Sequence, residues 1–154
     1  MIFEPVVLEG QHVRLETLYE SHQDGHYRAI SDGELWKIFL AIVPNSDDID
    51  QFFSNPKAAH ERGEGLAFAT IVKEGGDQVV GSTRFMNANM ANKRVEIWFT
   101  FLGRTWQRSQ TNTEAKLMML THAFETLGLN RVDLMTDYLS YAFRRAILRL
   151  GAKE

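Results

Sequence analysis

A polar, basic stretch, RTWQRSQTNTEAK, occupies Arg104 to Lys116 between a strand-like run and a helix-like run. The first turn of a helix presents backbone N–H groups without partners and the positive end of the helix dipole. A helix end of this kind can bind an anion, and phosphate suits it best. Arg104 and Arg108 add positive charge nearby. The stretch therefore indicates a phosphate site, although an ordinary capped helix with solvated arginines would show the same residues.

The sequence supports neither a metal site nor a thiol nucleophile. The chain has no Cys, which excludes disulfides, thiolate metal sites and a Cys nucleophile. His12, His22, His26 and His60 share no metal-ligand spacing, so no metal is expected, and His122 is expected to be a packed or surface helix residue. Six aromatic residues are expected mainly in the core, with some facing a pocket: Trp36, Phe39, Trp98, Phe99, Phe101 and Trp106.

Length and charge narrow the class of protein. A chain of 154 residues suits one domain, spanning 1–154. Its 17 basic and 20 acidic residues give a net charge of −3, so no global field attracts nucleic acid or a membrane. The N-terminus lacks the apolar core of a signal peptide, and no apolar run approaches the ~20 residues of a membrane span. A cytoplasmic protein is expected.

The first third of the chain predicts one strand followed by helices. Residues 12–18 alternate apolar and polar side chains, which is typical of a strand. Asp32 is a possible N-cap, Pro44 ends the segment that follows it, and Pro56 is expected to kink or break a helix. The three helical segments are 19–30, 32–44 and 46–62.

The middle of the chain predicts an antiparallel meander. Two strands, 66–73 and 78–86, flank the turn Glu74-Gly75-Gly76-Asp77, whose glycines permit positive φ angles. A third strand is expected at 92–103. Three consecutive strands with short connections favour a mainly antiparallel sheet.

The remainder predicts a helix, a strand and a last helix. Thr111 to Glu114 matches a capping box, and Gly128 is a plausible left-handed cap at the end of that helix. A strand at 130–137 and a helix at 140–150 follow. The element order indicates an α+β (mixed α/β) layer architecture. The expected inward faces are Leu117, Leu120, Phe124 and Leu127 in the first helix and Phe143, Ile147 and Leu150 in the second, with Arg144, Arg145 and Arg149 facing water.

From VVGSTRF to RRAILRLGAKE, and at LEGQHVRLETL near the start, the chain resembles the GNAT acyltransferases, in particular the branch of ribosomal-protein N-terminal acetyltransferases. The resemblance implies a central, mostly antiparallel sheet flanked by helices, acetyl-CoA as acyl donor and an amine as acceptor. It also implies that the loop 107–112 wraps the CoA pyrophosphate and that the strand 95–101 splays and binds the pantetheine arm. The implied cofactor-binding residues are Ile97, Trp98, Phe99, Gln107, Arg108, Ser109, Gln110, Thr111, Asn112, Thr113, Ser140 and Phe143.

Four residues depart from the family pattern at positions expected to line the cofactor cleft. Gln110 stands where the loop usually has Gly, and Trp98 replaces a small residue in the strand. Ser140 stands where Asn is usual, and Phe143 where a hydroxyl residue is usual. Either the cleft is remodelled or partly filled, or these are ordinary family differences compensated elsewhere.

The resemblance also implies the catalytic residues. Glu96 matches a position that often acts as base through water, although a structural ion pair with Arg94 or Arg84 is equally compatible with the sequence. Tyr138, Ser140 and Tyr141 are the hydroxyls near the expected position of a general acid. The leading function is acetyl-CoA-dependent transfer to a primary amine. The alternative is a GNAT scaffold that is catalytically impaired or repurposed as a binding or interaction protein, with an aromatic pocket in the cleft.

The end of the chain suggests a partner. Relatives usually continue past RLGAKE with two more strands, which are lacking here. A sheet that stops at 131–137 would leave an open edge, and an open edge invites pairing with another chain. A homodimer or swapped assembly is therefore expected.

Overall fold

Six strands form one sheet within the described residues, which are 2–33, 49–135 and 141–153 of this computed structural model. The strands lie side by side in chain order, and every neighbouring pair is antiparallel except β5 and β6, which are parallel. The predicted mixed architecture with a mostly antiparallel sheet is thus confirmed. The strands are β1 (Val7–Glu9), β2 (Val13–Thr17), β3 (Leu66–Val72), β4 (Gln78–Asn89), β5 (Arg94–Leu102) and β6 (Arg131–Leu134).

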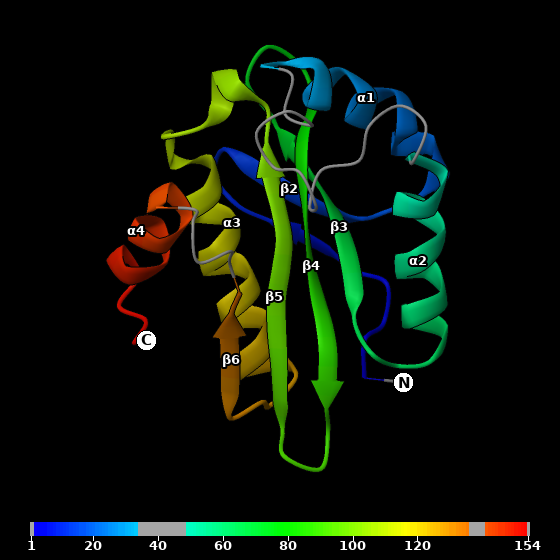
Figure 1. Ribbon diagram of the computed structural model, residues 1–154, viewed down its shortest axis with the longest axis vertical. Helices are drawn as coiled ribbons and strands as arrows, with labels where there is room; N and C mark the ends of the chain where they lie inside the picture. Colours follow the sequence, from blue (N-terminus) through cyan, green and yellow to red (C-terminus); the bar gives the residue numbers. More distant parts are fainter. Residues whose placement is uncertain (1, 34–48, 136–140, 154) are drawn as a thin grey trace.

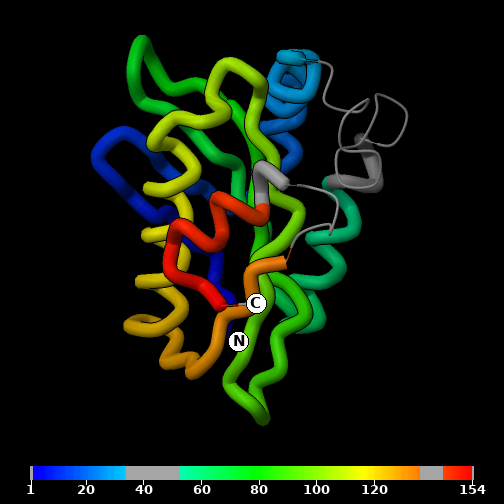
Figure 2. The backbone as a smooth tube through the Cα atoms, turned by 60° about the vertical axis from the view of Figure 1, so that its left-hand side comes forward, coloured from blue at the N-terminus to red at the C-terminus, as the bar shows by residue number. Residues whose placement is uncertain are grey.

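Helices cover both faces of this sheet. One face carries α3 and α4, and the other carries α1 and α2 (Figure 1). Figure 2 shows α4 beside α3, with α1 and α2 on the far side of the strands. The α-helices are α1 (Gln23–Ser31), α2 (Ile49–Glu61), α3 (Gln110–Thr121) and α4 (Tyr141–Arg149), and shorter helical turns are η1 (Glu20–His22), η3 (Arg104–Trp106) and the π-helical η4 (His122–Thr126).

The β3–β4 hairpin was predicted correctly. Gly75 and Gly76 adopt φ angles of +72° and +96°, which other residues rarely adopt. All seven residues of β3 are buried, because helices cover both of its faces. The main core lies between the sheet and α3, where Phe68 and Phe85 pack against Ala115 and Met119.

The predicted start and inward face of α3 were wrong in part. The helix begins at Gln110, and Ser109 is the N-cap, whose side chain accepts a hydrogen bond from the N–H of Thr111. The Glu114 carboxylate points away from the start of the helix, and its two oxygens lie 3.0 and 3.2 Å from the His12 N–H, which donates to them. Leu117 is 62% exposed and Phe124 45% exposed, because small side chains bring another face against the sheet. That buried face comprises Thr111, Ala115, Lys116, Met119 and Ala123.

Other elements agree with the predictions except in detail. The strand at 12–18 and the helix at 19–30 are present as β2 and as η1 with α1, whereas β1 was not predicted. Pro56 lies inside α2 and does not end it. Gly128 has a φ angle of +66°, as expected of a left-handed cap. Arg145 and Arg149 are exposed, and Arg144 is half-buried.

Some expectations fall outside the described residues. Most of the predicted helix 32–44, with Trp36 and Phe39, lies there, as do the last residues of the predicted strand 130–137. Within the described residues, β6 has a neighbour on one side only. Self-association through this edge stays a prediction.

Candidate functional site

A bulge in β5 places two consecutive residues, Trp98 and Phe99, on the same side of the sheet and Thr100 on the opposite side. Ser82 pairs with Phe101 and Arg84 pairs with Trp98, so Thr83 stands opposite two residues, Phe99 and Thr100. Phe99 has a φ angle of +52°, which is rare for a bulky side chain. The Arg84 guanidinium carbon lies 4.8 Å from the centre of the Phe99 ring, on the side of α1 and α2. Thr100 faces the opposite side, toward α3. The bulge thereby changes which side chains of β5 face α1 and α2 and which face α3.

β5 and β6 separate just beyond this point. Their pairing runs from Arg94 and Arg131 to Ile97 and Leu134, and the Met135 N–H donates to the Ile97 carbonyl at 3.0 Å. β5 continues to Leu102, whereas no described residue continues β6 alongside it. A cavity of about 30 Å³ opens at this splay. It is lined by Ile97, Trp98, Thr100, Asn112, Lys116, Leu134, Met135, Ala146, Ile147 and Leu150.

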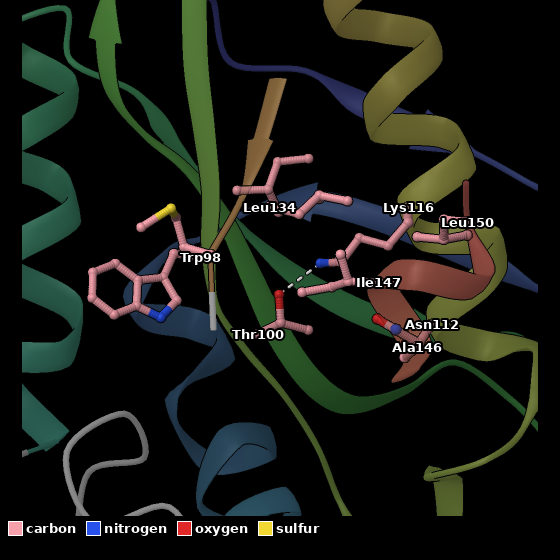
Figure 3. A pocket seen from close by; sticks show the side chains of 10 residues that line it. Trp98, Thr100, Asn112, Lys116, Leu134, Ala146, Ile147 and Leu150 are labelled. Carbon is pink, nitrogen blue, oxygen red and sulfur yellow. Dashed lines mark hydrogen bonds between the residues drawn. The ribbon is translucent and has the colours of Figure 1, made fainter. Parts of the chain in front are cut away.

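Lys116 provides the charged group of this cavity. Its side chain leaves α3 and reaches Thr100 on β5 (Figure 3). The Nζ donates to Thr83 Oγ1 at 2.8 Å and to Thr100 Oγ1 at 2.6 Å, and the residue is only 5% exposed. Burial lowers the pKa of Lys116 to about 7. Sequence reasoning missed this residue, because a lysine on a helix is normally solvated.

The polar loop before α3 is held by its own hydrogen bonds. The Gln107 side chain donates to the Leu102 carbonyl at 2.9 Å, and the Ser109 hydroxyl donates to the Trp106 carbonyl at 2.6 Å. Arg108 is exposed and has a φ angle of +59°. Arg104 contacts the Gly33 carbonyl at 3.4 Å and so belongs to the contact with the end of α1. Of the two arginines predicted beside an anion, Arg108 is the one at the mouth of α3.

The other predicted cofactor residues fall into three groups. Ile97, Trp98 and Asn112 line the cavity. Gln110 and Thr113 are exposed in the first turn of α3, and Thr111 is buried there. Ser140 lies outside the described residues, as does Tyr138, and Phe143 belongs to α4 with no described side chain.

Glu96 lies on the other side of β5 from Lys116. It pairs with Met86, next to the pair formed by Phe85 and Ile97, which faces the α3 core. Its carboxylate accepts from the Asn87 amide at 2.8 Å and from the Arg94 guanidinium at 3.2 Å. The ion pair that the sequence left open is therefore present. Figure 3 shows the Trp98 indole extending away from Lys116 and Thr100, although Trp98 contributes to the cavity lining.

Comparison with known protein families gives one match over most of the chain. Residues 12–153 match the family described as the Acetyltransferase (GNAT) domain. The chain belongs to the GNAT acetyltransferase family. A comparison with curated protein sequences found no match.

Solved structures of GNAT proteins share this fold. A GCN5-related N-acetyltransferase from Brucella melitensis is 27% identical, with a TM-score of 0.83 over 98% of this chain and 69% of that one. A Vibrio cholerae protein assigned as a ribosomal-protein-serine acetyltransferase is 17% identical, with a TM-score of 0.82 over 96% and 83%. RimL, a ribosomal L7/L12 alpha-N-protein acetyltransferase solved in complex with coenzyme A, is 14% identical, with a TM-score of 0.77 over 94% and 82%.

Among the described residues there is no cluster of His, Cys, Asp or Glu that could hold a metal ion. No helix in the described ranges combines the length and apolar character needed to cross a bilayer.

Proposed function

We propose that this GNAT domain transfers the acetyl group of acetyl-CoA to a primary amine, either a protein N-terminus or the amine of a small molecule. The single observation that carries the proposal is the arrangement at the β5 bulge. A splayed, mainly apolar cavity lies at the mouth of α3, and a carboxylate lies on the opposite side of the same strand. β5 can thus contact the thioester on one side and the amine on the other.

The first turn of α3 is where we expect the phosphates of CoA. Its N–H groups and dipole favour negative charge, and Arg108 stands exposed beside it. The residues around this helix end that we assign to phosphate binding are Gln107, Arg108, Ser109, Gln110, Thr111, Asn112 and Thr113. The loop hydrogen bonds of Gln107 and Ser109 support this assignment, because they hold the backbone in place before a ligand arrives.

The splay beside β5 is where we expect the pantetheine arm. The described β5–β6 pairing ends at Ile97, whose carbonyl already accepts from the Met135 N–H. We therefore expect the amides of the arm to bind the β5 backbone at Phe99, just beyond Ile97 and Trp98. Side chains of α4 form the opposite wall, as Ile147 and Leu150 do for the cavity. We assign Phe143 and Ser140 to the same wall as proposals from the family pattern.

The chemistry requires removal of a proton from the amine and delivery of one to the departing sulfur. When bound, acetyl-CoA supplies the thioester. Glu96 is our candidate base, acting directly or through a water, and Tyr138 and Ser140 are our candidate acids. Because Arg94 and Asn87 already engage the Glu96 carboxylate, the amine or water must share or replace one of these contacts.

A second candidate is a scaffold that binds a ligand without turnover. The size of the cavity favours it: about 30 Å³ has room for about two waters, at 10–15 Å³ for each. In the family pattern that the sequence resembles, smaller residues are usual at Gln110 and Trp98. If they limit access, replacing both by Gly should tighten CoA binding.

Calorimetric titration with acetyl-CoA and with CoA tests the proposal. Arg108→Ala should weaken both by about 10-fold or more, because a charge-assisted contact to phosphate is lost. Arg62→Ala is the matched control, since Arg62 is exposed near the end of α2 and pairs with Glu64. Arg108→Gly repeats the test without a side chain at the positive φ angle.

The results separate the candidates. CoA binding together with acetyl transfer to an amine supports the enzyme, and binding without transfer to any amine tested supports the scaffold. Absence of binding by the parent at millimolar CoA would remove the cofactor site altogether.

A further inference from the structure

Lys116 is a buried amine for which the described residues provide no counter-charge. Its only described polar partners are the hydroxyls of Thr83 and Thr100. It forms no ion pair within the described part of the chain, and burial alone lowers its pKa. A charged group in such a place is costly unless something pairs with it.

The two threonines do not need the lysine. Their Oγ1 atoms lie 2.8 Å apart and hydrogen-bond each other. A methionine at position 116 would leave that bond intact and would extend the apolar surface of Ala115 and Met119. The amine therefore does not serve to satisfy the threonine hydroxyls, and its role lies elsewhere.

The position of the amine indicates what it can contact. An ammonium group has three N–H donors, and two of them are used by Thr83 and Thr100. The third has no partner among the described residues, and the side chain lines the cavity. Lys116 lies four residues beyond Asn112, so it is about 6 Å deeper along α3 than the mouth of the helix.

The cavity walls limit the chemistry of the partner. Leu134, Ile147 and Leu150 are apolar, which disfavours a phosphate or another strongly hydrated anion. A carbonyl oxygen flanked by methylene groups would satisfy both the third N–H and these walls. Amide and thioester carbonyls of an acyl-pantetheine arm have this character.

We propose that Lys116 is a cofactor-binding residue that donates its third N–H to a carbonyl oxygen of the acyl-pantetheine arm, with Thr83 and Thr100 holding the amine in place. The proposal deepens the proposed function and rests on it. It assigns the two halves of CoA to different residues: the mouth of α3 binds the phosphates, and Lys116 binds the arm.

Two ligands separate these halves. CoA contains both, whereas adenosine 3′,5′-bisphosphate keeps the adenosine and two of the three phosphate groups and lacks the arm. Lys116→Met removes the donor at similar length, and Lys116→Gln keeps a neutral donor. Lys57→Met is the matched control, because Lys57 is exposed on α2. Calorimetry would give the dissociation constant of each ligand for each variant.

We expect Lys116→Met to weaken CoA by about 10-fold or more and to leave adenosine 3′,5′-bisphosphate within about 2-fold. Lys116→Gln should lose less, and Lys57→Met should bind both ligands like the parent. If Lys116→Met does not fold, a normal CoA affinity of Lys116→Gln or of Thr100→Val overturns the proposal, and a selective loss in either supports it.

The remaining outcomes contradict the proposal in distinguishable ways. Equal weakening of both ligands by Lys116→Met means that the lysine acts on the fold or on the phosphate half, and the arm contact is then wrong. Unchanged CoA affinity in Lys116→Met removes this residue and leaves the proposed function standing. A parent protein that binds neither ligand overturns the proposed function together with this inference.

Discussion

On the α3 and α4 side of β5, a lysine amine is buried against two hydroxyls, whereas on the α1 and α2 side a carboxylate is paired with an arginine and an asparagine. The lysine contacts Thr100 on β5, and the carboxylate belongs to Glu96 on the same strand. Among the described residues the lysine has no counter-charge, whereas the Glu96 carboxylate is paired with Arg94. A buried charge without a partner costs more stability than a paired one.

The bulge makes this division possible. In regular pairing, side chains alternate between faces one by one, and a bulge adds a residue that shifts the alternation. Phe99 is that residue, and it brings an aromatic ring next to Trp98, at 5.0 Å between ring centres, and under Arg84. The α1 and α2 side thereby gains an aromatic pair packed against the buried Arg84 guanidinium.

The largest effect is expected at Glu96, on the α1 and α2 side of β5. Glu96→Gln keeps the size of the residue and removes the base, so kcat should fall by about 10²-fold or more if Glu96 takes the proton of the amine. Release of free thiol from acetyl-CoA, followed with amine acceptors and N-terminal peptides, measures it. Binding of acetyl-CoA should stay unchanged, because Glu96 faces away from the cavity.

Asp133→Asn is the control for that substitution. Asp133 lies opposite Glu96 on β6, and its carboxylate contacts Arg94 at 3.4 Å and Arg131 at 2.8 Å. The substitution removes a carboxylate that shares Arg94 with Glu96 and leaves the candidate base in place. Equal losses of kcat in the two variants would show that Glu96 has a structural role and is not the base.

The next largest effect is a gain of stability on the cavity side. Lys116→Met should raise the free energy of unfolding near neutral pH by about 1–4 kcal/mol, because a buried amine is replaced by an apolar side chain. The pKa of Lys116 is about 7 in the folded protein and 10.5 as its ordinary value, so the unfolded chain binds more protons between these values. The penalty of the parent is therefore complete below about pH 7 and fades toward pH 10.

Urea unfolding of parent and variant at pH 7 and at pH 9.5 measures this difference. The gain should be larger at pH 7. A variant that is less stable than the parent at both pH values would show that the amine stabilises the fold, against the view that it is kept for a ligand.

A smaller effect is expected under the other face, at His26. This side chain is fully buried between Phe53 and Phe101, with ring centres 5.4 and 6.0 Å away, and burial lowers its pKa to about 4. Below pH 6.5 the unfolded chain gains a proton that the folded protein refuses, so stability is lost as the pH falls from 6.5 toward 4. At pH 5 this loss is about 2 kcal/mol.

His26→Gln keeps a hydrogen-bonding group and removes the titration. The difference in unfolding free energy between pH 7 and pH 5 should shrink by about 2 kcal/mol in this variant. The same pH dependence in parent and variant would assign the acid loss to other groups, such as the Glu16 carboxylate, whose pKa is lowered by its hydrogen bond to His22.

The sequence predicted the features that local chemistry controls. The Gly75-Gly76 turn, the strand order of the meander and the cap at Gly128 follow from glycine conformations and alternation, and all are present. The inward face of α3 was missed, because Leu117 and Phe124 carry more apolar surface than Ala115 and Ala123. Close packing against the sheet selected the small residues, and this depends on tertiary contacts that periodicity does not contain.

The two sides of β5 also differed in how far the sequence could predict them. The ion pair of Glu96 could be anticipated, because Arg94 stands two residues before it in the sequence. Its role as a base stays a prediction. Lys116 could not be anticipated, because a lysine on a helix is normally solvated and its burial depends on two threonines, one more than thirty residues before it along the chain. The bulge at Phe99 also gave no local signal, since it arises from the register of β4 against β5.

The smallest expected effect tests the corrected start of α3, at the mouth of the cavity. The Ser109 side chain accepts from the Thr111 N–H, so Ser109→Ala leaves that donor without its cap and should cost about 1 kcal/mol of unfolding free energy. Thr113→Ala is the matched control: Thr113 is exposed inside the first turn, its one described contact is a 3.4 Å approach of Arg149, and Ala is a better helix former. Chemical denaturation should therefore rank Ser109→Ala below the parent and leave Thr113→Ala at or slightly above it. The reverse order would return the cap to Thr111, since a helix beginning two residues later places Thr113 in the turn that needs satisfied donors.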